Sequence, residues 1–366
     1  MRILHIDTEM TWRGGENQLR LLLAGLARTD VENHVALRPQ SLAVERLKGL
    51  AQQVVLPMRG GFDLLAARQL AAYCKAHRID LIDAHTANGH SLGLLIRHLY
   101  PRVRLVVHRR VDYAPRQGLL NRRKYLSSKV DRFVAISHCI AKILADYGIP
   151  ESRISVVRSA IDTSIYGAMD RAQARAELAQ SFGIAPEVTL IGNASALTDQ
   201  KGYEVLLDAA AILKRQGEQF HVFIAGDGPL MSNLERQRQA LDLAHHVTFL
   251  GFIKEVPTFL TSLDILAVPS HNEGLGTILL DGLAAGLAVA ATAVGGIPEV
   301  ILPEVTGLLS ADSDSDGLAL NLARLIHNPE LRSRLNAAGK VHIAEEFSIA
   351  AMVGGNLDIY RELLRT

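Results

Sequence analysis

The most informative part of the sequence runs from residue 265 to residue 286: Ile265-Leu266-Ala267-Val268-Pro269-Ser270-His271-Asn272-Glu273-Gly274-Leu275-Gly276-Thr277-Ile278-Leu279-Leu280-Asp281-Gly282-Leu283-Ala284-Ala285-Gly286. Four apolar residues open it, a polar loop containing two glycines follows, and a helical pattern closes it. A second apolar run, Val289–Ala291, comes shortly afterwards. This order predicts a strand, a loop, a helix and a strand, which is the repeating unit of a parallel sheet.

The same alternation continues to both ends of the chain. Apolar runs in the first half predict strands at Ile3–Ile6, His34–Leu37, Leu81–Ala84, Leu105–Val107, Phe133–Ile136 and Ser155–Val157. Runs in the second half predict strands at Thr189–Gly192, Val222–Ala225, Thr248–Leu250, Ile265–Val268 and Val289–Ala291. Between these strands lie segments whose apolar residues have helical spacing, as in Leu19, Leu22, Leu23 and Leu26. Strands that are apolar throughout are buried on both faces, so we expect an α/β protein with two Rossmann-like parallel sheets facing a central cleft.

Length and composition fit this expectation. At roughly 100–200 residues per domain, 366 residues suit two domains. The only cysteines, Cys74 and Cys139, are too few for a disulfide framework or a cysteine metal site. The N-terminus turns polar too early for a signal peptide, and no run reaches the ~18 apolar residues of a membrane span. We therefore expect a cytoplasmic protein.

Charge is distributed unevenly along the chain. Residues 1–165 contain 25 Lys and Arg against 14 Asp and Glu, a formal charge of +11, although the whole chain carries only +1. The stretch 97–132 alone holds eleven basic residues and two acidic ones. Such an excess indicates an anionic partner, which is a phospholipid surface, a phosphorylated acceptor or nucleic acid. The alternative is a solvated basic face without a partner.

Polar residues at strand ends in the first half are candidates for a site. Gly14-Gly15 lies in a loop between a strand and a helix, where the backbone can approach an anionic ligand closely. The loop lacks the Gly-x-Gly-x-x-Gly pattern of nicotinamide enzymes, and an ordinary glycine turn would also explain it. His85 and His108 each end an apolar run and point toward the carboxyl edge of the sheet, although many histidines at such positions are structural.

Loops in the second half have the same character. Lys201 begins a helix after a polar loop, where its ammonium group can meet a diphosphate. Gly226-Asp227-Gly228-Pro229 makes a small-residue turn after another strand. Glu273 lies in the loop, and Asp281 lies eight positions later on the following helix. Eight residues of helix span ~12 Å. Two carboxylates so placed can grip the two ends of an elongated ligand but cannot share one proton or one metal ion.

These segments together resemble the retaining GT-B glycosyltransferases of family 4, also called group 1. The resemblance covers nearly the whole chain. In chain order the matching segments are Gly14-Gly15-Glu16, His108, Ala135-Ile136-Ser137, Ser159-Ala160-Ile161-Asp162, Lys201-Gly202, Gly226-Asp227-Gly228-Pro229, Gly251-Phe252, Glu273-Gly274 with Asp281 and Ala285-Gly286, and Gly295-Gly296-Ile297-Pro298-Glu299. Each segment alone is weak, but their joint order and spacing are specific.

The resemblance implies a role for each matching residue. It implies that His108, Glu273 and Lys201 are catalytic. The implied donor-binding residues are Gly14, Gly15, Gly228, Pro229, Phe252, Gly274, Leu275, Gly276, Thr277 and Asp281, and the implied acceptor-binding residues are Glu16, Arg109 and Ser137. No metal and no cofactor are implied. The acidic segment Asp312–Asp316 is expected to be a solvated surface loop.

Three positions depart from the family pattern. Asp281 stands where the family has glutamate, which is one methylene longer. Ser195-Ala196 occupies the place of an arginine, so we expect a second cation, Arg13 or Arg109, to help Lys201 hold the diphosphate. Ser159-Ala160 replaces Asn-Gly.

The resemblance also implies an organisation and a function. We expect an acceptor-binding domain at residues 1–165, rejoined by a C-terminal helix at 350–366, and a nucleotide-sugar-binding domain at 166–349. The expected reaction is retaining transfer of a sugar to a glycan or lipid-linked acceptor, in bacterial polysaccharide or lipopolysaccharide assembly. Peripheral contact with anionic membrane is expected and nucleic-acid binding is not. The alternatives are a sugar-nucleotide 2-epimerase, a phosphorylase or a catalytically inactive scaffold relative.

Overall fold

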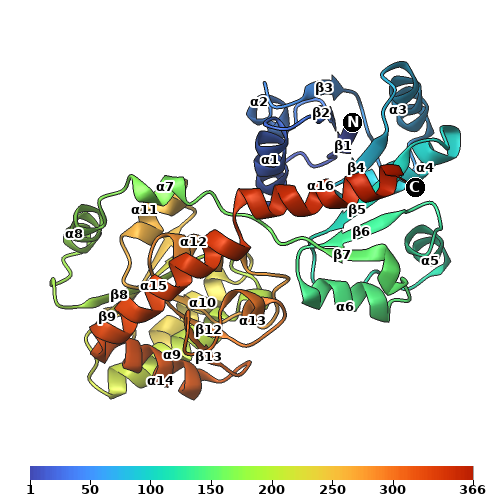
Figure 1. Cartoon of the computed structure of the whole chain (residues 1–366). Helices are drawn as coiled ribbons and strands as arrows, with labels where there is room; N and C mark the ends of the chain where they lie inside the picture. Colours follow the sequence, from blue (N-terminus) through green and yellow to red (C-terminus); the bar gives the residue numbers. More distant parts are fainter. Residues whose placement is uncertain (366) are drawn as a thin grey trace. The chain divides into compact units, whose positions relative to one another are not determined.

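The computed structural model describes residues 1–365 and divides them into two compact units (Figure 1). The first unit comprises Met1–Ala160 and the chain from Ser348 onward, and the second comprises Ile161–Phe347. The sequence placed these two boundaries after residues 165 and 349. At this boundary Ile161 N donates to the carbonyl of Phe347 at 2.9 Å, so the two segments that cross between the units are hydrogen-bonded to each other. Residue 366, the last of the expected C-terminal helix, lies outside the described residues.

The first unit contains a seven-stranded parallel sheet. Its strand order is β3-β2-β1-β4-β5-β6-β7. The strands are β1 (Arg2–Ile6), β2 (Glu32–Leu37), β3 (Gln52–Val55), β4 (Leu81–Ala84), β5 (Arg104–Arg109), β6 (Arg132–Ala135) and β7 (Ile154–Val156). The helices are α1 (Gly14–Leu26), α2 (Leu42–Arg46), α3 (Leu64–Ala76), α4 (Ala87–Leu99), α5 (Leu119–Tyr125), α6 (His138–Asp146), the short η1 (Glu151–Arg153) and α16 (Ile349–Arg365).

The second unit contains a six-stranded parallel sheet. Its strand order is β10-β9-β8-β11-β12-β13. The strands are β8 (Thr189–Ala194), β9 (Phe220–Ala225), β10 (Val247–Gly251), β11 (Ile265–Val268), β12 (Ala288–Thr292) and β13 (Leu308–Ser310). The helices are α7 (Ser164–Gly167), α8 (Arg171–Ser181), η2 (Asp199–Lys201), α9 (Tyr203–Arg215), α10 (Met231–Ala240), α11 (Val256–Thr261), α12 (Thr277–Ala284), α13 (Ile297–Val300), α14 (Ser315–His327) and α15 (Pro329–Glu346).

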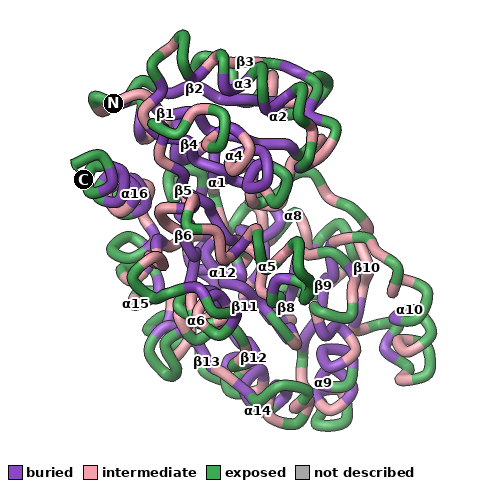
Figure 2. The backbone as a smooth tube through the Cα atoms, turned by 90° about the vertical axis from the view of Figure 1, so that its right-hand side faces the viewer, coloured by how far each residue is buried: buried purple, intermediate pink, exposed green. Residues whose placement is uncertain are grey.

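The predicted fold class of two parallel α/β domains is confirmed. Every strand predicted from an apolar run is present, and Figure 2 shows that the central strands of both sheets and parts of many helices are buried. The sequence missed β3 and β13. The first is a partly exposed edge strand that contains two glutamines, and the second has only three residues, so neither produces an apolar run.

The C-terminal helix α16 belongs to the first unit (red in Figure 1). Its apolar face, which includes Met352, Leu357 and Tyr360, packs in one hydrophobic cluster with Ile3 of β1 and Val106 of β5. Burial of such large side chains stabilises the helix on the sheet. The chain thus completes its first core with its last helix. Among residues 1–365, no helix is both long and apolar enough to cross a bilayer.

Candidate active site

The loop after β11 holds Glu273 in a buried position. Its carboxylate forms a close ion pair with the ammonium group of Lys201, and Oε1 also accepts a hydrogen bond from Ser270 Oγ at 3.3 Å. Lys201 ends the short helix η2, 72 residues earlier in the chain. The structure thus brings together two of the three residues that the sequence analysis named as catalytic.

Glycines allow this loop to lie against its neighbours. Gly295 has a φ of +53°, and a Cβ there would collide with the carbonyl oxygen of Glu273. A Cβ at Gly296 would collide with the carbonyl oxygen of Gly274, and Gly296 N donates to the carbonyl of Glu273 at 2.8 Å. Gly202, at a φ of +59°, approaches the carbonyl of Pro269 in the same way. These close backbone contacts fix the position of Glu273 relative to Lys201.

The Gly226–Pro229 turn is held by the same kind of contact. A Cβ at Gly226 would collide with the carbonyl oxygen of Ser195, and one at Gly228 with that of Leu197. The loops that follow β8 and β9 therefore lie backbone against backbone. Phe252, after β10, exposes most of its side chain. A flat ligand has an aromatic surface available there.

Helix α12 begins directly after the Glu273 loop. Gly276 precedes it with a φ of +79°, and Thr277 is exposed at its first turn. The side chain of Leu275 is buried, so Leu275 can offer only its backbone to a donor. The N–H groups of this first turn have no partners within the helix and favour a negative charge.

Asp281 of α12 has a partner that the sequence did not indicate. Tyr166 of α7 donates a hydrogen bond to its Oδ1 at 2.7 Å. Burial raises the pKa of Asp281 to about 6, although the Tyr166 hydrogen bond opposes this shift. In the structure Asp281 therefore binds Tyr166, and a contact with a donor ribose would have to share or replace that hydrogen bond.

The first unit carries His108 at the end of β5 beside a buried carboxylate. His108 Nε2 lies 3.1 Å from Asp83 Oδ1, and Tyr360 of α16 donates to Asp83 Oδ2 at 2.5 Å. Burial alone would raise the pKa of Asp83, but the facing imidazoles of His108 and His85 hold it well below its usual value. Burial also lowers the pKa of His108. Hydrogen bonds to an ionised Asp83 thus orient the His108 ring.

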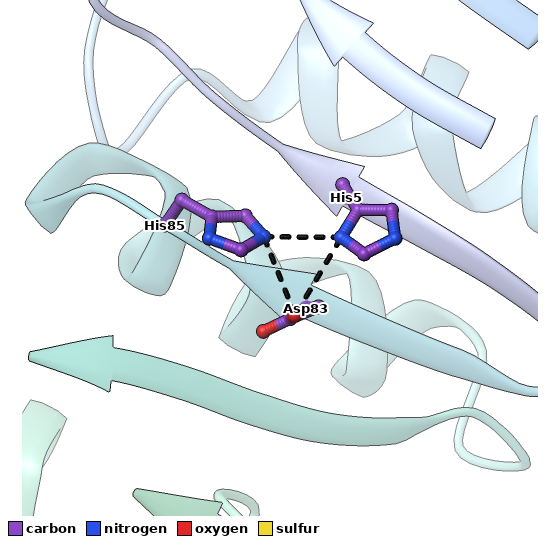
Figure 3. Close-up of side chains that lie close together, drawn as sticks. All are labelled: His5, Asp83 and His85. Carbon is purple, nitrogen blue, oxygen red and sulfur yellow. Dashed lines mark hydrogen bonds and ion pairs between the residues drawn. The ribbon is translucent and has the colours of Figure 1, made fainter. Parts of the chain in front are cut away.

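His5, Asp83 and His85 place their polar atoms within 4.8 Å of one another, close enough to hold a metal ion (Figure 3). Arg110 Nη2 lies 3.0 Å from His85 Nδ1, and because an arginine can only donate, this nitrogen accepts. Burial lowers the pKa of His85 to about 3, so the neutral ring keeps its proton on Nε2, which faces His5 Nδ1 at 3.0 Å. His5 then donates from Nε2 to Asn33 Oδ1 at 3.3 Å. A metal-bound histidine donates from its second nitrogen, as His5 does here, but the second nitrogen of His85 accepts from Arg110, so the contacts of His85 favour a hydrogen-bonded network.

A pocket of about 410 Å³ opens next to this network. It is lined by Arg13, Gly15, His85, His90, His108, Arg109, Arg110, Tyr113 and Tyr125, among others, all from the first unit. Arg109 is buried and donates to Tyr125 Oη at 3.0 Å and to the carbonyl of Tyr113. No carboxylate among residues 1–365 forms an ion pair with Arg109. The pocket therefore contains a buried guanidinium without an ion-pair partner, and the carboxylates of Glu9 and Glu16 also line it.

Two of the expected acceptor-binding residues also make local structural contacts. Glu16 Oε2 accepts a hydrogen bond from Arg13 N at 2.6 Å and so closes the first turn of α1. Ser137 Oγ accepts from Ile140 N at 3.2 Å and caps α6. Both side chains are buried, and Glu16 also lines the pocket beside His108. Capping by Ser is visible in sequence only once the start of the helix is known.

The acidic segment 312–316 also stabilises local structure. Asp312 pairs with His271 Nδ1 at 2.6 Å, and Asp314 caps α14 by accepting from Gly317 N at 2.8 Å. The residues that the sequence analysis missed are His5, Asp83, Tyr166 and Tyr360. Asp83 could have been found from the sequence, because an acid within an apolar strand needs a partner. Neither tyrosine could, because tyrosine is an ordinary residue in a helix.

Comparison with known proteins matches each of the two units to a family of glycosyltransferases. Residues 12–165 match the model of "Glycosyltransferase Family 4" and residues 174–342 that of "Glycosyl transferases group 1". A D-inositol 3-phosphate glycosyltransferase of Saccharomonospora viridis is 33% identical over 254 residues, which are 65% of this chain and 57% of that protein. The chain thus matches little more than half the length of this relative.

Solved structures resemble the whole chain. A glycosyltransferase from Rickettsia africae has a TM-score of 0.86 at 20% identity, covering 100% of this chain and 99% of the other. HepE from Anabaena, in complex with UDP, has a TM-score of 0.86 at 21% identity, covering 99% and 100%. At such identities the similarity establishes the architecture of the two chains.

Proposed function

Because the chain belongs to the group 1, family 4 glycosyltransferases and has their GT-B fold, we propose that it transfers a sugar from a nucleotide-sugar to a glycan or lipid-linked acceptor, with retention of configuration. The observation that carries this proposal is the Lys201–Glu273 ion pair in its loop of close backbone contacts. It places one cation and one carboxylate beside the start of α12, where a donor diphosphate and its sugar need them.

The donor site acts by stabilising the leaving group. Negative charge develops on the diphosphate oxygen as the bond to the sugar breaks, and the Lys201 ammonium with the first N–H groups of α12 offsets it. Glu273 neutralises Lys201 in the structure. We propose that the diphosphate takes over Lys201 and frees the Glu273 carboxylate for the hydroxyls of the sugar. These groups supply the positive charge, so we propose transfer without a metal ion.

The acceptor site is the pocket beside His108. A buried cation is costly without a counter-charge, and the Arg109 guanidinium has none within ion-pair distance in residues 1–365. We therefore propose an acceptor with a phosphate or carboxylate group. The phosphorylated acceptor in the name of the Saccharomonospora relative supports this choice.

Ligand-induced thermal shifts test the donor site. UDP and UDP-glucose are the first probes because the Anabaena structure contains UDP. At a hundred times its Kd, a donor stabilises the folded protein by about 2.7 kcal/mol. Lys201→Met should remove the shift, whereas Lys214→Met, which breaks a surface pair with Asp242, should keep it. If no nucleotide-sugar of any base shifts the melting temperature, the donor assignment is wrong.

The course of the reaction has its own tests. NMR of the product should show the anomeric configuration of the donor, and an inverted linkage would exclude a retaining mechanism. Excess EDTA should leave turnover within about twofold, because Lys201 and the helix amides supply the positive charge. A large loss that Mg²⁺ restores would contradict the metal-free proposal.

A sugar-nucleotide 2-epimerase, a phosphorylase and an inactive scaffold are the other candidates. An epimerase consumes its donor without an acceptor, a phosphorylase requires inorganic phosphate, and a scaffold turns over neither. We propose assembly of bacterial cell-surface polysaccharide or lipopolysaccharide as the setting, since apolar side chains exposed on the first unit suit a lipid-linked acceptor.

A further inference from the structure

Two loops of the first unit expose large apolar side chains. Phe62, Leu64 and Leu65, at the start of α3, are between 58% and 70% exposed. Leu119 and Leu120, at the start of α5, are 77% and 68% exposed. Both loops follow strands of the parallel sheet, β3 and β5, so both lie at its carboxyl edge.

The two loops flank the first turns of the same helix, α4. A Cβ on Gly61 would lie 2.7 Å from the Cβ of Ser91, so the first loop packs directly on α4. On the other side, Lys124 of α5 donates to the carbonyl of Ala87 at 2.6 Å. The five apolar side chains therefore border one end of α4, and we call them the apolar rim. The pocket beside His108 is lined by Ala87, by Tyr113 of the second loop and by Tyr125 of α5, so it opens next to the rim.

Unpaired arginines accompany the apolar rim. Arg59 and Arg68 belong to the first loop and α3, and Arg116, Arg122 and Arg123 to the second loop and α5. All five are exposed, and none forms an ion pair with any residue in the described range 1–365. The carboxylate of neighbouring Asp63 caps α3, where it accepts a hydrogen bond from Ala66 N at 3.0 Å. The rim thus combines apolar side chains with net positive charge.

The remaining basic residues of the 97–132 stretch do not extend this surface. Arg97 and Arg104 both pair with Asp131, and Arg132 pairs with Glu362 at 2.6 Å. Arg109 is buried. Arg102 is also exposed, but it precedes β5 and so lies at the opposite edge of the sheet from the rim. Within this stretch, Arg116, Arg122 and Arg123 are therefore the exposed arginines on the side of the rim.

We propose that the first unit docks on a lipid leaflet containing anionic lipids, with the apolar rim inserted and the five arginines at the level of the head groups. Water-exposed Leu and Phe side chains favour transfer into the acyl boundary, and arginines there attract anionic lipids. Docking brings the mouth of the pocket to the membrane, where a lipid-linked acceptor can enter it.

Co-sedimentation with vesicles tests the docking without any catalytic activity, so it is independent of the proposed transfer reaction. The wild-type protein should sediment with equimolar phosphatidylglycerol and phosphatidylcholine vesicles, and much less with phosphatidylcholine alone. The double variant Leu119→Ser/Leu120→Ser should bind the anionic vesicles about tenfold more weakly, because two apolar side chains no longer insert. Phe62→Ser/Leu65→Ser should act similarly.

Leu320→Ser is the matched control. Leu320 is 63% exposed on α14 of the second unit, so its loss alters surface apolarity but not the rim. Arg122→Gln/Arg123→Gln should weaken binding at low salt and leave a residual, salt-insensitive component. Unfolding curves must match the wild type for each variant.

Three outcomes would overturn the proposal. The first is a wild-type protein that stays in the supernatant with anionic vesicles at low salt. The second is a set of rim variants that bind vesicles as tightly as Leu320→Ser. The third is sedimentation velocity showing a concentration-dependent dimer that the rim variants abolish, because the rim would then be an interface between two copies of this chain.

Discussion

At the scale of single residues, the site depends on charges whose partners are fixed. Glu273 faces Lys201, and Asp83 faces a set of imidazoles and one phenol. The first pair is partly open to ligands, whereas the second group is enclosed. Substitutions at the two places should therefore have different consequences for activity and for stability.

Glu273→Ala should lower turnover by at least about a hundredfold and leave the fold intact. The carboxylate pairs with Lys201 and accepts from Ser270, and the pair is mostly buried, so the substitution also lowers stability without preventing folding. Steady-state kinetics and thermal unfolding measure the two effects. The Glu273 assignment fails if the variant keeps near-normal turnover.

His85 should make stability depend on pH. Its pKa of about 3 in the folded protein lies below the ordinary 6.5, so between these values the unfolded chain binds a proton that the folded one does not. Stability then falls as the pH drops through this window, by up to about 1.4 kcal/mol per pH unit from this residue. Asp7, whose pKa burial raises to about 7, acts in the opposite direction, losing stability as the pH rises from 4 to 7.

Chemical denaturation at several pH values separates the two contributions. His85→Gln should flatten the fall in unfolding free energy between pH 6.5 and 4, because glutamine does not titrate. Asp7→Asn should make the same fall steeper. Curves of equal slope for wild type and His85→Gln would show that His85 is not held neutral.

At the scale of elements, the Glu273 loop is set by backbone contacts with glycines. Gly202, Gly295 and Gly296 each lie where a Cβ would meet a carbonyl group. The loop thus depends on residues from two other segments of the second unit. Adding a single methyl group at one of these glycines should therefore change the geometry of the loop.

Gly295→Ala should destabilise the protein by about 2–3 kcal/mol and reduce turnover strongly. The substitution adds backbone strain at positive φ and a collision with the Glu273 carbonyl, which displaces the carboxylate from Lys201. Gly217→Ala is the control, because Gly217 has a φ of +79° in the same unit with nothing within 4 Å of its Cβ position. It should cost about 1 kcal/mol and leave turnover unchanged. Equal effects of both variants would mean that the collision is relieved without moving Glu273.

At the scale of the whole molecule, the last helix completes the first unit. Helix α16 carries Tyr360 across the sheet to Asp83, which is 277 residues away in sequence. The orientation of His108 therefore depends on a residue near the C-terminus. A substitution of Tyr360 should therefore alter the pocket beside His108.

Tyr360→Phe should destabilise the protein by about 1–3 kcal/mol, because it removes a donor from a buried carboxylate. It should also lower turnover, since Asp83 gains a proton more readily and holds His108 less firmly. Tyr73→Phe removes a similar hydrogen bond, to His34 at 2.8 Å, in the same unit but away from the pocket. Loss of activity in both variants alike would assign Tyr360 a purely structural role.

The sequence alone determined the two sheets, the glycine loops and the identity of Lys201, Glu273 and His108 as candidates. Apolar runs and turn residues act over a few neighbouring positions, so they are visible without knowledge of the fold. Edge strand β3 was missed because two of its four residues are glutamines, so it produces no apolar run.

Only the tertiary structure decided which of these residues meet. The Lys201–Glu273 pair, the Tyr166–Asp281 contact and the Tyr360–Asp83 contact join residues that are 72, 115 and 277 positions apart. Such pairs arise when helices pack on a sheet, and no local pattern encodes them. The structure also shows that Glu16 and Ser137 each make a hydrogen bond at the start of a helix, which the sequence analysis did not predict. It also divided the basic stretch into buried partners and exposed arginines, because burial is a property of the folded chain and not of its sequence order.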